Sequence, residues 1–219
     1  MNWGANASGW NYPPSHYLPP VKKELRIIDN SLTQEIAIDC EMVEATLNRR
    51  RFSVLARVSI VNSHCQPLLD TYVDPMYDVS DYRTPYSGIL PEHLDNAPTY
   101  TDVRNCVVGL VHGRTLIGHD LKQDLAVLDI KNLPGIRMRD TSSCYMSYFK
   151  PNEKPSLKRL ASAVLGQTIQ IGAHDSMEDA KAAMKLYKHW LFLGRNEEDA
   201  LPPELDNRQT TSSRSRKRV

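Results

Sequence analysis

The hydrophobic pattern predicts an antiparallel meander followed by alternating helices and strands. Apolar residues alternate with a period of two over residues 36–43, 52–61 and 67–73, and short polar turns separate these segments, as is typical of strands joined by hairpins. Helical spacing or short apolar runs then predict helices at 99–113, 121–128, 156–166 and 176–193, with strands at 115–118 and 136–138. This order of elements predicts an α/β fold, a mixed sheet with helices packed against it.

The two ends of the chain differ in composition from this α/β pattern. Residues 1–24 are rich in Asn, Gly, Ser, Tyr and Pro, which predicts a flexible N-terminal arm. Residues 195–219 are polar and finish in a basic cluster, which predicts a disordered basic tail. We therefore expect one domain over residues 25–194. Within it, the proline-rich segment 74–91 reads as a long loop, and loops of this length are often functional.

The first predicted strand carries two acids on one face. Its alternation places Asp39 and Glu41 on the same side, roughly 6–7 Å apart along the strand. Like charges this close on an apolar strand raise each other's pKa. One explanation is an edge strand whose acidic face meets water, and the other is a divalent cation held between the two acids.

Two further segments place an acid near an apolar helix face. Asp124 shares the leucine face of its predicted helix, and Asp179 lies in the first turn of the last helix, five residues after His174. Each has an ordinary explanation by itself: solvent exposure for Asp124, the helix dipole for Asp179 and a surface loop for His174. A shared cavity explains all three together. Ligands made of oxygen alone suit Mg²⁺ or Mn²⁺, and two such ions about 3.5–4 Å apart promote phosphodiester hydrolysis.

Three segments resemble the motifs of the DEDDh 3′-to-5′ exonucleases, namely Asp39 to Val43, Gly118 to Asp124 and His174 to Asp179. The first of them, together with the loop 81–89 and residues 178–180, is similar to the branch that contains RNA exonuclease 4 and the interferon-stimulated exonuclease. The resemblance covers about three quarters of the chain, from near residue 33 to residue 193.

This resemblance implies an RNase H-like fold and a two-metal reaction. It assigns two Mg²⁺ or Mn²⁺ ions to Asp39, Glu41, Asp124 and Asp179, and it makes His174 the base that deprotonates the attacking water. The expected product is a nucleoside 5′-monophosphate released from a 3′ end. Glu44 departs from the family, which usually has Gly there, and this difference bears on the local turn and on the access of substrate.

The expected partner is single-stranded RNA. Arg83 is a candidate contact near the scissile phosphate, Lys122 and the arginines 49–51 are candidate nucleic-acid contacts, and Met42 either packs against the terminal base or belongs to the core. Single-stranded DNA is the alternative substrate, because nothing in the sequence visibly reads a 2′-hydroxyl. An inactive nucleic-acid-binding module is a third alternative, although all five catalytic residues are present.

Composition bears on the partner and on the compartment. The formal net charge is +1, so nucleic-acid binding must come from local patches. The four cysteines form no CxxC pair, which fits a reducing compartment. We expect no signal peptide, no secretion and no membrane partner. The basic cluster at 214–218 reads as a nuclear address or a tether to RNA, so a nuclear or nucleolar location is expected, with the cytoplasm as the alternative.

Overall fold

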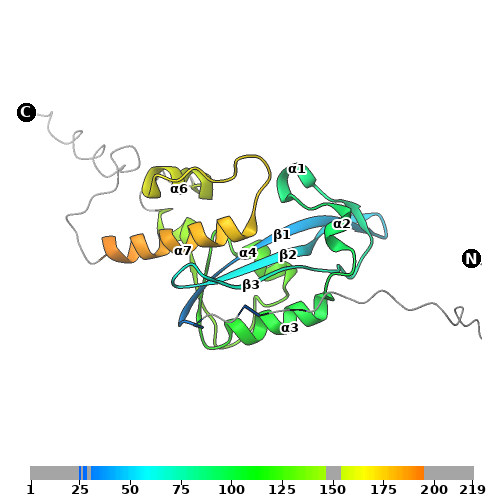
Figure 1. Ribbon diagram of the computed structural model, residues 1–219, viewed down its shortest axis with the longest axis horizontal. Coiled ribbons are helices and arrows are strands. Elements are labelled where there is room, and N and C mark those ends of the chain that lie inside the picture. Colours follow the sequence, from blue (N-terminus) through cyan, green and yellow to red (C-terminus); the bar gives the residue numbers. More distant parts are fainter. Residues whose placement is uncertain (1–24, 26, 29–30, 147–153, 195–219) are drawn as a thin grey trace, which may run out of the picture.

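A mixed sheet runs through the middle of the molecule (Figure 1). The computed structural model describes residues 25, 27–28, 31–146 and 154–194. Within these residues the sheet has six strands in the order β3-β2-β1-β5-β6, with β4 paired to β1 outside this row. The strands are β1 (Glu35–Leu47), β2 (Arg50–Asn62), β3 (Pro67–Tyr72), β4 (Val79–Asp81), β5 (Thr115–Gly118) and β6 (Arg137–Asp140).

The strand β1 is central in this sheet. It pairs antiparallel with β2 and β4 and parallel with β5. The explanation of Asp39 and Glu41 as acids on an edge strand facing water is therefore wrong. A register shift between Glu41 and Met42 marks a bulge in the pairing with β2, which bends the strand next to the second acid.

Helices cover both faces of the sheet (Figure 1). Ile36, Ile38 and Cys40 of β1 pack on the side of the third and fourth helices, whereas Ala37 packs under the last helix. The alternating pattern of β1 thus separates two hydrophobic layers. The helices are α1 (Thr84–Ser87), α2 (Pro91–Leu94), α3 (Tyr100–Val111), α4 (Lys122–Val127), α5 (Thr141–Cys144), α6 (Leu157–Leu165) and α7 (Ser176–Leu193).

Side-chain caps fix where the three longest helices begin. Thr99 accepts a hydrogen bond from the backbone N–H of Asp102 at the start of α3, and Ser156 caps α6. Asp175 caps α7 by accepting from the backbone N–H groups of its first turn. Each cap satisfies N–H groups that have no partner inside the helix. These starts, and the helices that follow them, confirm the sequence prediction.

The segment 74–91 differs from the predicted loop, because it contains β4, α1 and the start of α2. The predicted turn 48–51 is also shorter, since β2 begins at Arg50 and only Asn48 and Arg49 adopt positive φ angles, 51° and 63°. The elements of this segment have three or four residues each and are not apolar throughout, so they leave neither a periodic signal nor an apolar run in the sequence. The predicted N-terminal arm and C-terminal tail lie outside the described residues.

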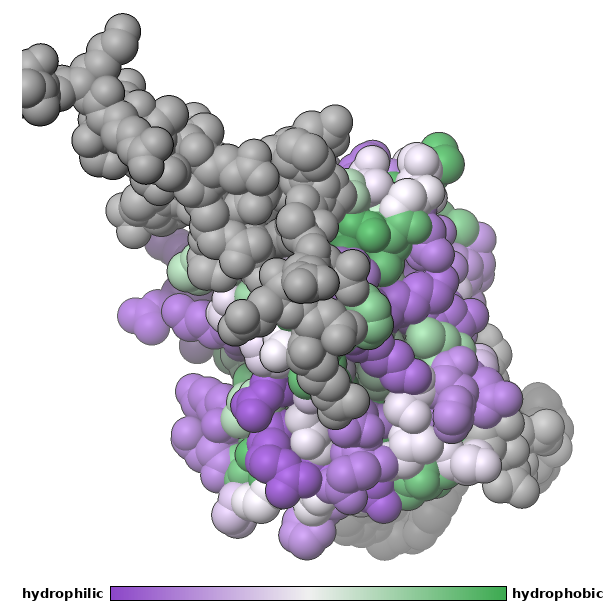
Figure 2. Space-filling model, turned by 90° about the vertical axis from the view of Figure 1, so that its left-hand side faces the viewer, coloured by the Kyte–Doolittle hydropathy of each residue, from purple (hydrophilic) through white to green (hydrophobic). Residues whose placement is uncertain are grey.

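The surface adds two observations. Figure 2 shows one end of the molecule, where the side chains not drawn in grey are mostly hydrophilic and apolar ones form small patches. Among the described helices, none has the length and apolar character needed to cross a membrane.

Candidate active site

Two adjoining cavities form a cleft above the middle of β1. Their volumes are about 290 and 500 Å³. One extends toward α1 and α4, and the other toward the start of α6 and the segment before α7. We call the two together the acidic cleft. Both cavities are lined by Cys40, Glu41, His119, Asp120 and His174.

The four predicted metal ligands all border the acidic cleft. Glu41 lines both cavities, Asp124 lines the smaller one, and Asp39 and Asp179 line the larger one. Asp39 is half-buried, and the other three are buried. Three elements supply them, since Asp39 and Glu41 come from β1, Asp124 from α4 and Asp179 from α7. The fold therefore brings the three acidic segments to one place.

Burial and mutual repulsion make these acids hard to ionise. Burial raises the pKa of Glu41 to about 8 and that of Asp179 to about 6. The pKa of Asp39 is raised by burial and then by the charges of Asp124, Asp179 and Glu41. The pKa of Asp124 is raised by burial and then by Glu41. A cluster of this kind is stable at neutral pH when cations balance its charge.

Two buried oxygens support a cation at this place. Glu41 Oε1 and Asp179 Oδ1 have no hydrogen-bond partner among the described residues. A buried carboxylate oxygen without a donor is costly, and carboxylate oxygens are the preferred ligands of Mg²⁺. The acids do not yet form a closed shell, because no three His, Cys, Asp or Glu side chains of the described chain are grouped closely enough to hold one ion.

His174 stands at the rim of the cleft. Its Nδ1 lies 3.7 Å from Asp179 Oδ2, which is too far for a hydrogen bond, and 43% of its side chain is exposed. Its backbone N–H donates to the carbonyl of Tyr86 in α1 at 2.7 Å. The main chain of His174 is thus fixed while its ring remains accessible to water.

His119 also lines the cleft, but its ring is occupied. Nδ1 lies 2.9 Å from Thr141 Oγ1, and Nε2 lies 3.0 Å from the carbonyl oxygen of Pro155. Burial lowers its pKa. With both ring nitrogens engaged, His119 is suited to holding β5 against the segment that precedes α6. His174 is the histidine with the freedom to accept a proton.

Two polar residues of the site were missed in the sequence. Arg57 of β2 lies opposite Glu41, and its charge lowers the pKa of both Asp39 and Glu41. The sequence did contain a sign of its role, because an arginine inside the apolar run 54–61 is unusual. Gln170 donates from Nε2 to Asp179 Oδ2 at 2.8 Å. No sequence pattern marks Gln170, because its contact depends on the path of the loop before α7.

The three predicted substrate contacts differ in position. Met42 and Arg83 line the smaller cavity of the cleft. Lys122 is exposed and lines neither cavity, whereas its neighbour Gln123 lines the smaller one. The reason is that α4 begins at Lys122 and turns its side chain to solvent while Asp124 points inward. Lys122 as a contact to nucleic acid therefore stays a prediction, for a strand that runs outside the two cavities.

Glu44 does not disturb the turn after β1, since the strand continues to Leu47. Its Oε2 accepts a hydrogen bond of 2.9 Å from Arg83 Nη2, and Arg83 Nη1 donates to Ser53 Oγ at 2.9 Å. The residue that departs from the family pattern thus holds the guanidinium of Arg83 at the wall of the cleft.

A family model described as exonuclease matches residues 36–187. RNA exonuclease 4 of Cryptococcus neoformans is 42% identical over 185 residues, and that of Saccharomyces cerevisiae is 39% identical over 173 residues. Both alignments cover 77% of this chain, and they cover 44% and 59% of those relatives. The chain therefore spans less than two thirds of the length of these curated relatives.

Solved structures agree with this family. The exonuclease module of Saccharomyces cerevisiae Pan2 in complex with AAGGAA RNA is similar with a TM-score of 0.66 and 32% identity, covering 75% of this chain and 30% of that one. The Neurospora crassa Pan2 catalytic unit gives a TM-score of 0.64 and 29% identity, covering 86% and 32%. The sheet and its flanking helices have the RNase H-like fold that the sequence predicted. The chain belongs to the exonuclease family.

Proposed function

We propose that this protein is a metal-dependent 3′-to-5′ exonuclease that hydrolyses phosphodiester bonds of single-stranded RNA and releases nucleoside 5′-monophosphates. The observation that carries the proposal is the set of four acids around one cleft, two of them with buried oxygens that have no partner among the described residues. The names of the relatives support RNA as the substrate, since they are RNA exonucleases.

Asp39, Glu41, Asp124 and Asp179 are the ligands that we assign to two Mg²⁺ or Mn²⁺ ions. Such ions, when bound, activate water and stabilise the charge of the leaving oxygen. The protein contributes the placement of these ligands, because the strand β1 fixes two of them and the buried starts of α4 and α7 fix the others. Arg57 reduces the repulsion among the acids without filling the cleft.

His174 is the residue that we assign as general base. Its ring takes the proton from the attacking water, and Asp179 Oδ2 lies 3.7 Å from Nδ1 on the side of the acids. Arg83 contacts a phosphate of the substrate from the wall of the cleft, and Met42 supplies an apolar surface for the terminal base. The mechanism thus needs five residues for the reaction and two for binding.

Digestion of end-labelled oligonucleotides tests this proposal. With Mg²⁺ or Mn²⁺, 5′-labelled single-stranded RNA should shorten stepwise from its 3′ end, and a chelator should stop the reaction. A double-stranded end should resist digestion, because only a single strand can reach the buried metal ligands. Faster digestion of a DNA of the same sequence would show that DNA is the preferred substrate. Cuts within a circular RNA would contradict the exonuclease assignment.

We also propose a nuclear location, supported by the basic residues Arg214, Arg216, Lys217 and Arg218. A fluorescent fusion of the full chain should concentrate in the nucleus, and replacement of these four residues by Gln should spread it into the cytoplasm. Unchanged distribution would contradict this role of the cluster.

A further inference from the structure

A third cavity of about 230 Å³ lies beside the acidic cleft and has no part in the reaction described above. Its walls are mainly apolar and aromatic. Met76 and Tyr77 are 66% and 41% exposed, and Tyr77 packs edge-on against Phe52 with ring centroids 5.0 Å apart. We call it the aromatic cavity, lined among others by Phe52, Leu55, Met76, Tyr77, Tyr100 and Val127.

The aromatic cavity and the acidic cleft have no lining residue in common, but the same helix and the same pair of strands border both. The helix α4 borders both, with Asp124 on the cleft and Val127 on the aromatic cavity. Leu55 in the aromatic cavity pairs in register with Met42 in the cleft. The two spaces therefore lie one after the other along the same strand pair and the same helix.

Positive charge lies at the junction of the two spaces. Arg83 of the cleft donates to Ser53, which lines the aromatic cavity. Glu44 holds the same guanidinium, and Arg51 Nη1 lies 3.5 Å from the other oxygen of Glu44. Glu44 and Asp81, whose Oδ1 accepts from the backbone N–H of Arg83 at 2.8 Å, balance the charges of these two arginines, so the excess of positive charge comes from the neighbouring turn. A phosphate that passes from one space to the other would meet donors suited to it.

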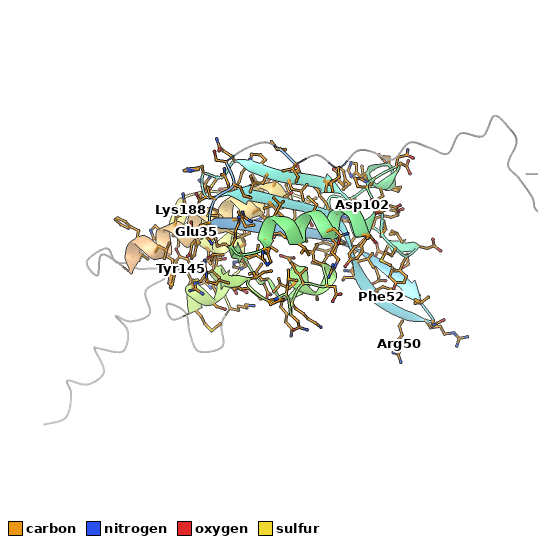
Figure 3. The ribbon with its side chains drawn as sticks, turned by 90° about the horizontal axis from the view of Figure 1, so that it is seen from below. Glu35, Arg50, Phe52, Asp102, Tyr145 and Lys188 are labelled. Carbon is orange, nitrogen blue, oxygen red and sulfur yellow. The ribbon has the colours of Figure 1, made fainter. Side chains whose placement is uncertain are left out.

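The turn between β1 and β2 extends this positive surface. Arg49 and Arg50 are exposed there, and Figure 3 shows Arg50 projecting from the end of the hairpin that also carries Phe52. An apolar cavity next to several exposed arginines fits a single-stranded nucleic acid, which offers flat bases and a charged backbone. A purely apolar protein segment would leave this charge without a partner.

We propose that the aromatic cavity binds a base of the same RNA strand, upstream of the 3′-terminal nucleotide in the acidic cleft, while the backbone passes Arg83 and Arg51. This inference rests on the proposed function. Stacking against an aromatic ring is tolerant of sequence, because every base has a π face. The cavity would make the enzyme prefer longer strands without selecting a sequence.

The length preference of the enzyme tests the aromatic cavity. For the wild type, kcat/KM should be higher for a decanucleotide than for a dinucleotide. Tyr77→Ala should lower the ratio of these two values by at least about fivefold, which is the low end of the effect of losing one stacked base. Tyr77→Phe keeps the ring and should keep the ratio. Phe192→Ala removes an aromatic residue that is 51% exposed on α7 and should also keep it.

Photocrosslinking tests the same idea without cleavage. RNA with a single 5-iodouridine, moved one position at a time, is bound to full-length Asp39→Asn protein and irradiated. Crosslinks to Met76 or Tyr77 are expected from an internal position and not from the 3′-terminal one. The inference would be overturned if no internal position crosslinks to this cavity. It would also be overturned if Tyr77→Ala leaves the ratio of the two kcat/KM values unchanged. Failure of the wild type to cleave either RNA would instead contradict the proposed function.

Discussion

Arg57 limits the repulsion between Asp39 and Glu41 but does not remove it. Its guanidinium donates to both oxygens of Asp70, at 2.9 and 3.0 Å, and lies 3.5 Å from Asp175. One positive charge is thus divided among several acids. The pKa values of Asp39 and Glu41 stay raised in spite of it. At the scale of single residues, the cleft keeps an excess of negative charge that bound cations would balance.

The first prediction concerns Asp39. Asp39→Asn should abolish cleavage, because it removes a proposed metal ligand. The metal-free variant should be at least as stable as the wild type, since the mutation removes a charge that burial and three other acids oppose. Thermal unfolding in EDTA measures this, and Asp129→Asn, at an exposed acid, is the control. An Asp39→Asn protein that unfolds would make Asp39 a structural residue.

The second prediction concerns His174. Loss of a general base typically lowers the rate about 10²–10⁴-fold, and we expect a loss of this size in His174→Ala. The backbone bond from His174 to Tyr86 does not need the side chain, so the loop should keep its position. The increase in unfolding temperature caused by Mg²⁺ should therefore remain.

Two outcomes would contradict this role of His174. If His174→Ala loses the Mg²⁺-induced shift in unfolding temperature, the histidine is a metal ligand. If it leaves the rate unchanged, the histidine is an ordinary loop residue. His64→Ala, at an exposed turn histidine, is the matched control and should change neither measurement.

The acids of the site were predicted from their combination, since each alone has an ordinary explanation, whereas the contact made by Gln170 could not be predicted. Each of Asp39, Glu41 and Asp124 breaks an apolar pattern within its own element, and such a break is visible in the sequence. Gln170 reaches Asp179 only because a loop with a positive φ angle at Gln170 turns its side chain toward α7. Contacts of this kind depend on tertiary structure and leave no local pattern.

At the scale of elements, the short helix α1 positions the proposed base. The carbonyl of Tyr86 in α1 accepts the backbone N–H of His174. Gly88, which ends α1 with a φ angle of 66°, lies so close that a Cβ there would be 3.2 Å from the carbonyl oxygen of His174. The segment 74–91, which the sequence marked as a long loop of a kind that is often functional, is thus in direct contact with the proposed base.

The third prediction uses this close contact. Gly88→Ala should lower kcat by about tenfold, since a displacement of ~1 Å can cost about 100-fold and the one expected here is smaller. Gly166→Ala is the control, because Gly166 ends α6 with a similar φ angle of 63° and a Cβ added there would meet no atom within 4 Å. Both variants should lose about 1–2 kcal/mol of stability from the left-handed backbone. Equal kcat values for the two variants would contradict the positioning role of Gly88.

Long elements with a clear period were predicted well, and so was the short apolar strand β5 at residues 115–118, whereas the helices of a single turn were not predicted. The helix α7 shows its buried face at every turn, and a cap marks where it begins. The helices α1, α2 and α5 have four residues each, which is about one turn. Tertiary packing stabilises such helices more than their own sequence does.

At the scale of the whole molecule, the central position of β1 assembles the site. The antiparallel half of the sheet lies on one side of β1 and the parallel half on the other. The sequence predicted the change from antiparallel to parallel strands through the order of its elements. It did not predict that the first strand lies between them, because strand pairing depends on residues more than 70 positions apart, such as Ala37 and Ile117.

The last prediction concerns the stability of the metal-free protein as a function of pH. In the folded chain the pKa of Glu41 is about 8 and that of Asp179 is about 6, whereas unfolded Glu and Asp have values of about 4.3 and 3.9. The folded state therefore holds these protons more tightly than the unfolded state. This contribution to stability is complete below about pH 4 and is lost as the pH rises through about 6 and about 8.

Unfolding temperatures in EDTA should accordingly fall between about pH 5 and about pH 8.5, over the range in which these groups ionise. Glu41→Gln should flatten the part of the curve near pH 8, while Glu92→Gln, at an exposed acid of α2, should not. Mg²⁺ binds the ionised carboxylates, so its stabilising effect should grow over the same range. In the acidic cleft, Mg²⁺ must compete with protons that are held at these raised pKa values. A Mg²⁺ effect on the unfolding temperature that is the same at both ends of this pH range would therefore show that the ion binds somewhere other than the acidic cleft.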